Sequence, residues 1–272
     1  MTFYFLWGEN MNILLIGGDR RQAYIAEMLN NAGHKVEHYT KRSELNNKFD
    51  KFDVIILPFP TTRDGTTVYN TLTEEKIFLK EIEVKITGQK VLCGNYMLEN
   101  KNCTDYGKSD SLAILNAVPT AEGAIEIAIK NTDFTLWNSK CLIVGNGKIG
   151  KILADRLVGL KADVTVSARK DTDFAFLEAD NIKHIETGKI KSHIKEFDII
   201  FNTVYTPVIK KEELINCKKD CLLIELASAP YGIDIDAAKA LNLKVIVAPG
   251  LPGKIAGYTA AKILFEIIKK II

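Results

Sequence analysis

An α/β fold with two doubly wound parallel sheets is the architecture that this sequence predicts. Residues 141–170 read as strand, glycine turn, amphipathic helix and strand, and residues 12–39 repeat the same plan. Short apolar segments also alternate with helical patterns along both halves of the chain, which is typical of parallel sheets with helices on both faces. We therefore expect two Rossmann-like domains that flank an interdomain cleft.

The composition is that of an ordinary globular protein of 272 residues, with 47% hydrophobic residues, 26% charged residues and a net charge of +2. The small net charge gives no indication of nucleic-acid binding, and no uninterrupted apolar run reaches the ~18 residues of a membrane span. Five cysteines, one of them in a predicted core strand, favour reduced thiols in the cytoplasm. No cluster of cysteines and histidines has the spacing of metal ligands, so no metal is expected.

The first domain is predicted over residues 11–118. Residues 1–10 lack the features of a signal peptide and are interpreted as a leader or disordered extension. A helix is expected over 74–85, and strands are expected over 12–16, 35–39, 53–57, 90–93 and 112–115. The first glycine turn, Gly17–Gln22, has a glutamine in place of the last glycine and charged side chains at the helix start. These features disfavour a pyrophosphate there but not a small anionic ligand.

The second domain is predicted over residues 119–256. Pro119 is expected to open an interdomain helix that ends at Lys130, with Thr120 and Glu122 facing the cleft. Buried strands are expected over 141–144, 164–166, 182–185, 198–202, 221–226 and 244–247. The C-terminal segment, 257–272, reads as an apolar-striped closing helix that either packs back on the first domain or is plain core.

A dinucleotide-binding turn is predicted at Gly145-Asn146-Gly147-Lys148-Ile149-Gly150. Gly145 makes the tight turn, Gly147 lets the backbone approach a pyrophosphate, and Gly150 lets helix and strand pack closely. The N–H groups and the partial positive charge of the helix start then face the phosphates. The alternative, a glycine turn without a ligand, is disfavoured because the strands, the helix and the spacing all agree.

The end of the next strand predicts which dinucleotide binds. An NAD site usually places a carboxylate there for the ribose 2′-hydroxyl. This chain has Ser167, Arg169 and Lys170, a hydroxyl and two cations that suit a 2′-phosphate. NADP is therefore favoured, with NAD as the alternative. The plain interpretation is that Arg169 and Lys170 are ordinary solvated charges of a loop. Thr203 and Ser228 follow later strands, where we expect them to line a nicotinamide pocket.

Hydride transfer to or from a small molecule is the chemistry that such a chain indicates. Its plan resembles the 2-hydroxy-acid dehydrogenases, but it has no arginine in Glu225–Asp234 and no histidine in Ala248–Gly250, where that family has them. The four histidines are expected at the surface and are poor candidates for a general base: His34, His38, His184 and His193. An oxidoreductase of other specificity and a non-catalytic NADP-binding subunit both remain alternatives.

Several motifs occur together along the chain. They are Gly17-Gly18-Asp19-x-Arg21-Gln22, Leu57-Pro58, Asn116-x-x-Pro119-Thr120-x-Glu122-Gly123, Thr132-Asp133-Phe134-Thr135, Leu226-Ala227-Ser228 and Ala248-Pro-Gly-Leu-Pro-Gly253. With these motifs the chain from residue 11 to its end resembles the A subunits of dipicolinate synthases from spore-forming bacteria. It departs from that family at Ala229, where a basic residue is frequent, and at the start of the closing helix.

The resemblance implies NAD(P)-dependent oxidation of a dihydrodipicolinate to the aromatic pyridine-2,6-dicarboxylate, dipicolinate. The substrate would be a small cyclic dicarboxylate made from the hydroxytetrahydrodipicolinate of the lysine pathway. The resemblance also implies that the partner is a flavoprotein-like B subunit, and that the protein works in the cytoplasm of the mother cell during sporulation. The oligomeric state stays open, a homo-oligomer included.

The implied reaction needs positioning more than a strong base, because the ring becomes aromatic as the hydride leaves. Our hypothesis is that Arg21 and Thr120 hold the substrate and that Asp19 orients Arg21, since guanidinium pairs well with carboxylate. Glu122 would assist proton removal or position a water. The plain alternative is that Asp19 and Arg21 only cap and pair at a helix start.

Overall fold

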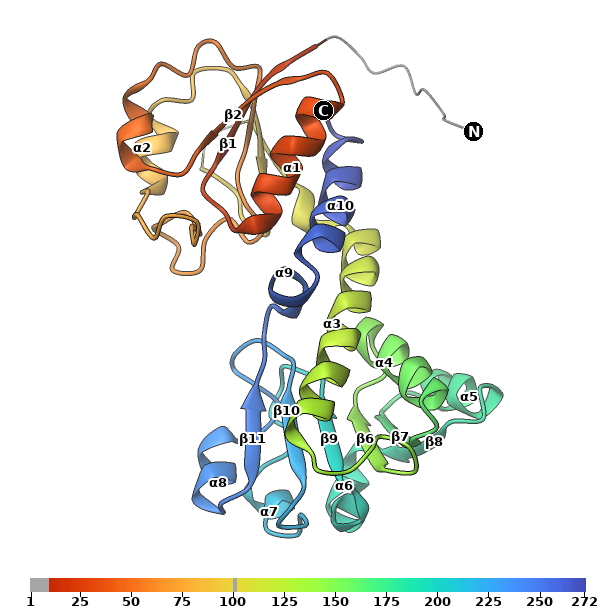
Figure 1. Ribbon diagram of the computed structural model, residues 1–272. Helices are drawn as coiled ribbons and strands as arrows, with labels where there is room; N and C mark the ends of the chain where they lie inside the picture. The colour runs from red at the N-terminus through yellow and green to blue at the C-terminus, as the bar shows by residue number, and fades with distance from the viewer. Residues whose placement is uncertain (1–9, 100–101) are drawn as a thin grey trace. The chain divides into compact units, whose positions relative to one another are not determined.

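The computed structural model describes residues 10–99 and 102–272, and the chain forms two compact units (Figure 1). Unit 1 comprises the residues up to Leu115 together with Ala256–Ile272, and unit 2 comprises Asn116–Ile255. Each unit is built around one parallel sheet with α/β connections, so the predicted fold class is confirmed. The leader prediction covers residues 1–10, of which 1–9 lie outside the described part, and the cleft between domains stays a prediction.

Unit 1 contains a five-stranded sheet with the order β2-β1-β3-β4-β5. The strands are β1 Asn12–Ile16, β2 Lys35–Tyr39, β3 Val54–Ile56, β4 Lys90–Cys93 and β5 Cys103–Asp105. The helices are α1 Arg20–Asn31, α2 Leu79–Glu83 and α10 Gly257–Ile268, with 3-10 helices at Arg42–Asn46 and Tyr106–Lys108. Successive residues of β1 point to opposite faces of the sheet: Leu14 belongs to one core cluster and Leu15 to the other.

The C-terminal helix α10 belongs to the core of unit 1. Its residues Ala261 and Leu264 are buried in the same cluster as Ile25 and Leu29 of α1. The rings of Tyr24 and Tyr258 meet edge to face, with centroids 5.5 Å apart. The helix therefore packs back on the first domain, as one of the two interpretations of the sequence predicts.

Unit 2 contains a six-stranded sheet with the order β11-β10-β9-β6-β7-β8. The strands are β6 Lys140–Val144, β7 Asp163–Ala168, β8 Lys183–Glu186, β9 Ile199–Asn202, β10 Leu222–Glu225 and β11 Lys244–Val247. The helices are α4 Lys148–Gly159, α5 Asp171–Ala179, α6 Ile190–His193, α7 Lys211–Leu214, α8 Ile235–Ala240 and α9 Leu251–Ile255, with 3-10 helices at Thr187–Lys189 and Ile194–Glu196. Because β6 lies between β7 and β9, the turn after it sits where the strand order reverses, the usual ligand position in such sheets.

Helix α3 (Asp110–Asn131) corrects two predictions. Residues 112–115 are helical rather than a strand, and Pro119 lies inside the helix rather than at its start. The alanines that share the buried face recur at helical spacing: Ala117, Ala121, Ala124 and Ala128. This buried stripe favours a continuous helix despite Pro119, whose missing N–H leaves the carbonyl of Leu115 without its helical donor.

Within the described residues, α3 is also the one helix long and apolar enough to cross a membrane by length and composition. Its most apolar window is 44% buried inside the protein. Ala121, Ala124 and Ala128 belong to the core of unit 2, which is the behaviour of a core helix.

Three further predictions need correction. The helix expected over 74–85 is helical only in α2, because the preceding residues pair as extended chain: the Val68 N–H donates to the Ile77 carbonyl at 2.8 Å. Strands β8 and β11 are partly exposed rather than buried, since each is an edge of its sheet. Strand β5, also an edge, is not anticipated by any pattern in the sequence.

Candidate cofactor and substrate sites

The glycine turn between β6 and α4 has the backbone geometry that a dinucleotide site needs. Gly145 has a φ of +101°, in the left-handed region that L side chains rarely adopt. A Cβ on Gly150 would lie 2.0 Å from the Gly145 carbonyl oxygen, so α4 can pack this closely only with glycine there. A Cβ on Gly147 would meet nothing within 4 Å. The turn therefore directs backbone N–H groups into open space, which suits a pyrophosphate.

Two polar side chains at this turn each have a buried oxygen without a partner in the described part of the chain. Ser167, in β7, is fully buried and its hydroxyl has no hydrogen-bond partner within the described residues. Asn146 donates from Nδ2 to Oδ1 of Asp173 at 3.3 Å, whereas its own Oδ1 is buried without a partner in the same part of the chain. Unpaired buried polar atoms are rare in folded proteins. The hydroxyl and phosphate groups of a dinucleotide can supply the missing partners, so these residues fit that ligand.

Arg169 and Lys170 follow Ala168, the last residue of β7, at exposed positions, and in residues 10–99 and 102–272 neither forms an ion pair. Both cations are thus open to an anionic ligand.

Asp173, in the first turn of α5, is a carboxylate near the glycine turn that the sequence analysis missed. The acidic first turn of the helix after β7 was the signal that could have found it. A carboxylate there suits a ribose hydroxyl rather than a phosphate.

The other predicted cofactor residues lie along the same edge of the sheet. Lys148 and Ile149 form the first turn of α4, where Ile149 packs against the core. Thr203, directly after β9, donates from Oγ1 to the Val144 carbonyl at 2.8 Å and so ties β9 to the glycine turn. Ser228 is exposed in the loop after β10.

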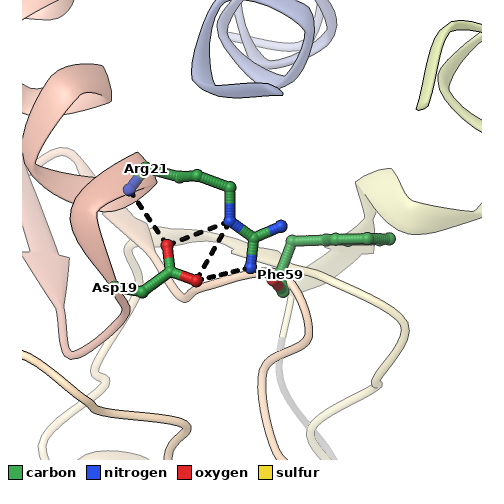
Figure 2. Close-up of polar contacts among 3 residues, drawn as sticks. All are labelled: Asp19, Arg21 and Phe59. Carbon is green, nitrogen blue, oxygen red and sulfur yellow. Dashed lines mark hydrogen bonds and ion pairs between the residues drawn. The ribbon is translucent and has the colours of Figure 1, made fainter. Parts of the chain in front are cut away.

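The N-terminus of α1 in unit 1 holds the predicted pair of Asp19 and Arg21 (Figure 2). Asp19 is the N-cap, and its Oδ1 accepts the Arg21 backbone N–H at 2.9 Å. The same carboxylate accepts from Nε of Arg21 at 2.9 Å and from Nη2 at 2.8 Å. Nη2 also donates to the Phe59 carbonyl at 2.5 Å, in the loop after β3. The guanidinium is thus fixed along one side.

The other terminal nitrogen of Arg21, Nη1, carries no hydrogen bond to the described residues and points away from Asp19 in Figure 2. The Arg21 side chain is 11% exposed. The loop beside it is itself held, because the hydroxyl of buried Tyr106 donates to the Leu57 carbonyl at 2.9 Å. The result is a rigid, nearly desolvated cation with free donors, which favours binding of a small carboxylate.

Thr120 and Glu122 both belong to unit 2, and each has a partner within it. The Thr120 hydroxyl donates to the Asn116 carbonyl at 2.7 Å, one turn back in α3. Glu122 is 3.5 Å from Nε of Arg156 and lines a groove of about 730 Å³ between α3 and α4. Arg156 lies two turns beyond the glycine turn, so the structure does not bring Glu122 to that turn. The catalytic roles of both residues stay predictions.

The histidines include one misplaced by sequence analysis. His34 is 4% exposed, whereas a surface position was expected. It lies in the turn after α1 and packs beside the start of β1, where the Met11 N–H donates to its Nδ1. Nε2 of His38 lies 2.7 Å from the Gly17 carbonyl, and burial lowers the pKa of His38. His184 and His193 sit beside glutamates near the surface. None of the four lies at a strand end of unit 2.

Comparison with known proteins agrees with this geometry. The family model described as shikimate / quinate 5-dehydrogenase matches residues 126–248. The transhydrogenase from Sinorhizobium meliloti has the same fold, with a TM-score of 0.66 over 95% of this chain and 92% of that one at 13% identity. The two parallel sheets and the open glycine turn therefore define a two-domain protein of the Rossmann type, the fold of nicotinamide-dependent oxidoreductases.

Closer similarities identify the family. The model of the N-terminal domain of the dipicolinate synthase A chain matches residues 12–109. The A chain of dipicolinate synthase from Bacillus subtilis is 30% identical, with 96% of each chain covered. The crystal structure of its counterpart from Bacillus halodurans superposes with a TM-score of 0.86 at 27% identity, covering 96% of this chain and 97% of that one. The chain belongs to the family of dipicolinate synthase A subunits.

Proposed function

We propose that this chain oxidises dihydrodipicolinate to dipicolinate. Hydroxytetrahydrodipicolinate first loses water to give the dihydropyridine. The ring then loses a hydride from carbon and a proton, and becomes a pyridine. When bound, the nicotinamide cofactor serves as the hydride acceptor. The likeness to named A subunits along nearly the whole chain supports this reaction.

The pair of Asp19 and Arg21 is the observation that carries the proposal. A cyclic dicarboxylate needs a fixed cation, and Arg21 offers one that is already oriented by two hydrogen-bonded partners. Because no rotamer freedom remains to be lost, a carboxylate bound at Nη1 is placed rather than merely attracted. Aromatisation supplies much of the driving force, so the residues need to orient the ring more than to activate it.

NADP is the cofactor that we propose, because Arg169 and Lys170 stand exposed where a 2′-phosphate would lie and, in the part of the chain that the structure describes, form no ion pairs. Asp173 favours the second candidate, NAD, because it approaches the same turn through Asn146. Titration of the protein with NADPH and NADH separates the two. A larger weakening of NADPH than of NADH in Arg169→Ala supports NADP, and equal weakening contradicts it.

We also propose that the protein works in the mother-cell cytoplasm together with a partner B subunit, since the matched relatives are named as A subunits of a synthase. The test mixes this chain with freshly generated hydroxytetrahydrodipicolinate and NADP, with the B subunit present or left out. A rise in the absorbance of reduced nicotinamide together with that of the pyridine dicarboxylate supports the reaction. No rise in either mixture, despite cofactor binding, contradicts it.

Arg21→Lys sharpens this test, because lysine keeps the charge but cannot pair with Asp19 and the Phe59 carbonyl and also present Nη1 to a substrate. We expect kcat/KM to fall on the order of 100-fold, the loss of a charge-assisted hydrogen bond from Nη1, while cofactor affinity is unchanged. Arg20→Lys is the matched control at the exposed neighbouring position and should leave the rate unchanged. Equal effects of the two substitutions would remove Arg21 from the substrate site.

A non-catalytic cofactor-binding subunit is the second candidate. It is favoured by one observation: within the described residues no histidine lies at the carboxyl ends of the strands of unit 2, beside the glycine turn. Cofactor binding without turnover, converted to turnover only by the B subunit, is the result that supports this alternative.

A further inference from the structure

A completely buried carboxylate, Glu225, ends strand β10 in unit 2. Its two oxygens accept five hydrogen bonds. Nδ2 of Asn202 donates to both, at 2.7 and 2.9 Å. The backbone N–H groups of Ala227, Gly232 and Ile233 donate at 2.9, 3.0 and 2.9 Å. No base in this cluster pairs with the acid, and no step of the proposed reaction uses it.

All five contacts are donors, so the ionised carboxylate is the form that the geometry suits. Burial raises the pKa of Glu225, and the hydrogen bonds from Asn202 and the backbone oppose that rise. A protonated acid would turn one O–H toward an N–H donor. The cluster has therefore been built around an anion that costs free energy to bury, which calls for a function beyond packing.

The Glu225 carboxylate holds both ends of the loop that follows β10. Residues 226–231 leave β10 and come back so that Gly232 packs on Asn202, where a Cβ would lie 2.4 Å from Nδ2. Within this loop Tyr231 has a φ of +61°, a conformation that a non-glycine residue holds only when its surroundings fix it. Ser228, a predicted cofactor residue, lies in the same loop.

The cluster continues across the sheet to the glycine turn. Asn202 is the last residue of β9, and Thr203 beside it donates to the Val144 carbonyl at 2.8 Å. A Cβ on Gly145 would lie 2.8 Å from the Thr203 hydroxyl oxygen. Hydrogen bonds and packing thus join the carboxyl ends of β6, β9 and β10, in that order, to the loop 226–233.

These three strand ends belong to different halves of a dinucleotide site. In sheets of this strand order the first half, β6 to β8, receives the adenosine side, and the second half, β9 to β11, receives the other nucleotide. Loop 226–233 therefore borders the nicotinamide side. We propose that Glu225 is a positioning residue that, through Asn202 and the backbone of this loop, holds the nicotinamide half of the site in its binding geometry.

This inference rests on the proposed binding of a nicotinamide dinucleotide in unit 2. If the loop leaves its geometry part of the time, the apparent affinity falls by the fraction of molecules that are competent. The loss of affinity should be seen for ligands that contact the nicotinamide half of the site. Ligands that stop at the adenosine half should bind as before.

The experiment uses Glu225→Gln in the full chain, because glutamine keeps the shape but turns an NH₂ toward at least one donor. Calorimetric titration compares NADPH with 2′-phospho-ADP-ribose, the same molecule without nicotinamide, and NADH with ADP-ribose. We expect the Kd of the complete dinucleotide to rise about tenfold or more, the size of one unsatisfied buried donor, and the Kd of the truncated ligand to change less than about twofold.

Asn202→Ala is the second variant, because it removes the side-chain hydrogen bonds to Glu225 and leaves the carboxylate in place; it should show the same selectivity. Glu178→Gln, an exposed glutamate of α5, is the matched control and should change neither affinity. Equal weakening of both ligands in folded variants overturns the proposal, as does no weakening of either. Failure of the wild-type chain to bind any of the four ligands would instead contradict the proposed function itself.

Discussion

The two glycine turns of this chain are built on the same plan and differ in what lies above them. In unit 2, a Cβ on Gly147 would meet nothing within 4 Å. In unit 1 the equivalent position is occupied by Asp19, whose side chain caps α1. The Gly18 N–H donates to the Tyr69 carbonyl at 2.7 Å, and the Thr71 N–H donates to the Gly18 carbonyl at 2.8 Å.

Residues 69–71 thus cover the first turn at Gly18 and pair with both of its backbone groups. Within the described residues, the backbone N–H of Asn146, at the same place in the second turn, has no such partner and is left for a ligand. One strand–turn–helix design can therefore serve as a cofactor site or as a closed frame for a neighbouring arginine. The loop inserted after β3 decides which of the two it becomes.

The largest expected effect concerns the close packing in the open turn. Gly150→Ala places a methyl group 2.0 Å from a backbone oxygen, so we expect a loss of about 3 kcal/mol of stability together with loss of cofactor binding. Urea unfolding measures the first and NADPH titration the second. Gly159→Ala in the same helix is the control, because its Cβ meets nothing within 4 Å. Equal stability of the two variants would show that the packing is not tight.

The closed turn should respond to substitution in stability alone. Gly17→Ala clashes with Val68 and holds alanine at a φ of +65°, and we expect a cost of about 2 kcal/mol. NADPH affinity should not change. Adding Val68→Ala should recover part of the loss caused by Gly17→Ala, measured as a coupling energy in a double-mutant cycle. A fall in NADPH affinity in the single variant would mean that the turns are not independent.

A suitable substitution in the open turn should lower the affinity for the cofactor without lowering the stability of the protein. Gly147 is the N-cap of α4 with extended backbone angles, and serine is a preferred residue at that position. Gly147→Ser should therefore keep the thermal midpoint of the wild type while its Cβ intrudes on the phosphates. We expect the Kd for NADPH to rise about tenfold, equivalent to ~1.4 kcal/mol. Unchanged affinity at unchanged stability would argue against a pyrophosphate there.

The smallest effect concerns pH and the closed turn. His38 lies against the Gly17 carbonyl with Glu44 nearby, and burial lowers its pKa below the ordinary 6.5. The unfolded chain then takes up the proton more readily than the folded chain. The stability contributed by neutral His38 is present above pH 6.5 and is lost as the pH falls through the window below it. Urea titrations across this range should show a shallower loss in His38→Gln than in the wild type.

Local patterns in the sequence carry much of the fold. The strands at the centre of each sheet follow from apolar runs, and the turn at residues 145–150 follows from glycine spacing beside a strand and a helix. The run Leu112–Leu115 could not be assigned in this way, because a short apolar segment fits a buried strand and a helix equally well. Only the alanine stripe that follows, seen against its packing partners, decides for α3.

The residues of the candidate sites also form two groups, those that local sequence patterns reveal and those that they do not. Gly147 and Arg21 are recognisable from their neighbours in the sequence. Asp173 is not, because its approach to Asn146 depends on how α5 begins after an exposed loop. The network around Glu225 depends on a loop that returns after seven and eight residues to Gly232 and Ile233. Contacts of this kind arise from tertiary structure, which no local pattern of residue types contains.

The core of unit 1 is completed by the end of the chain. Ala261, Leu264 and Ile268 of α10 pack with Ile25 of α1, yet they are synthesised after the whole of unit 2. Unit 2 is continuous in sequence and can gain its structure while it leaves the ribosome. The N-terminal sheet must wait, with the apolar face that α10 will cover exposed to water until α10 has been synthesised. Its dependence on chaperones should therefore be greatest before α10 leaves the ribosome.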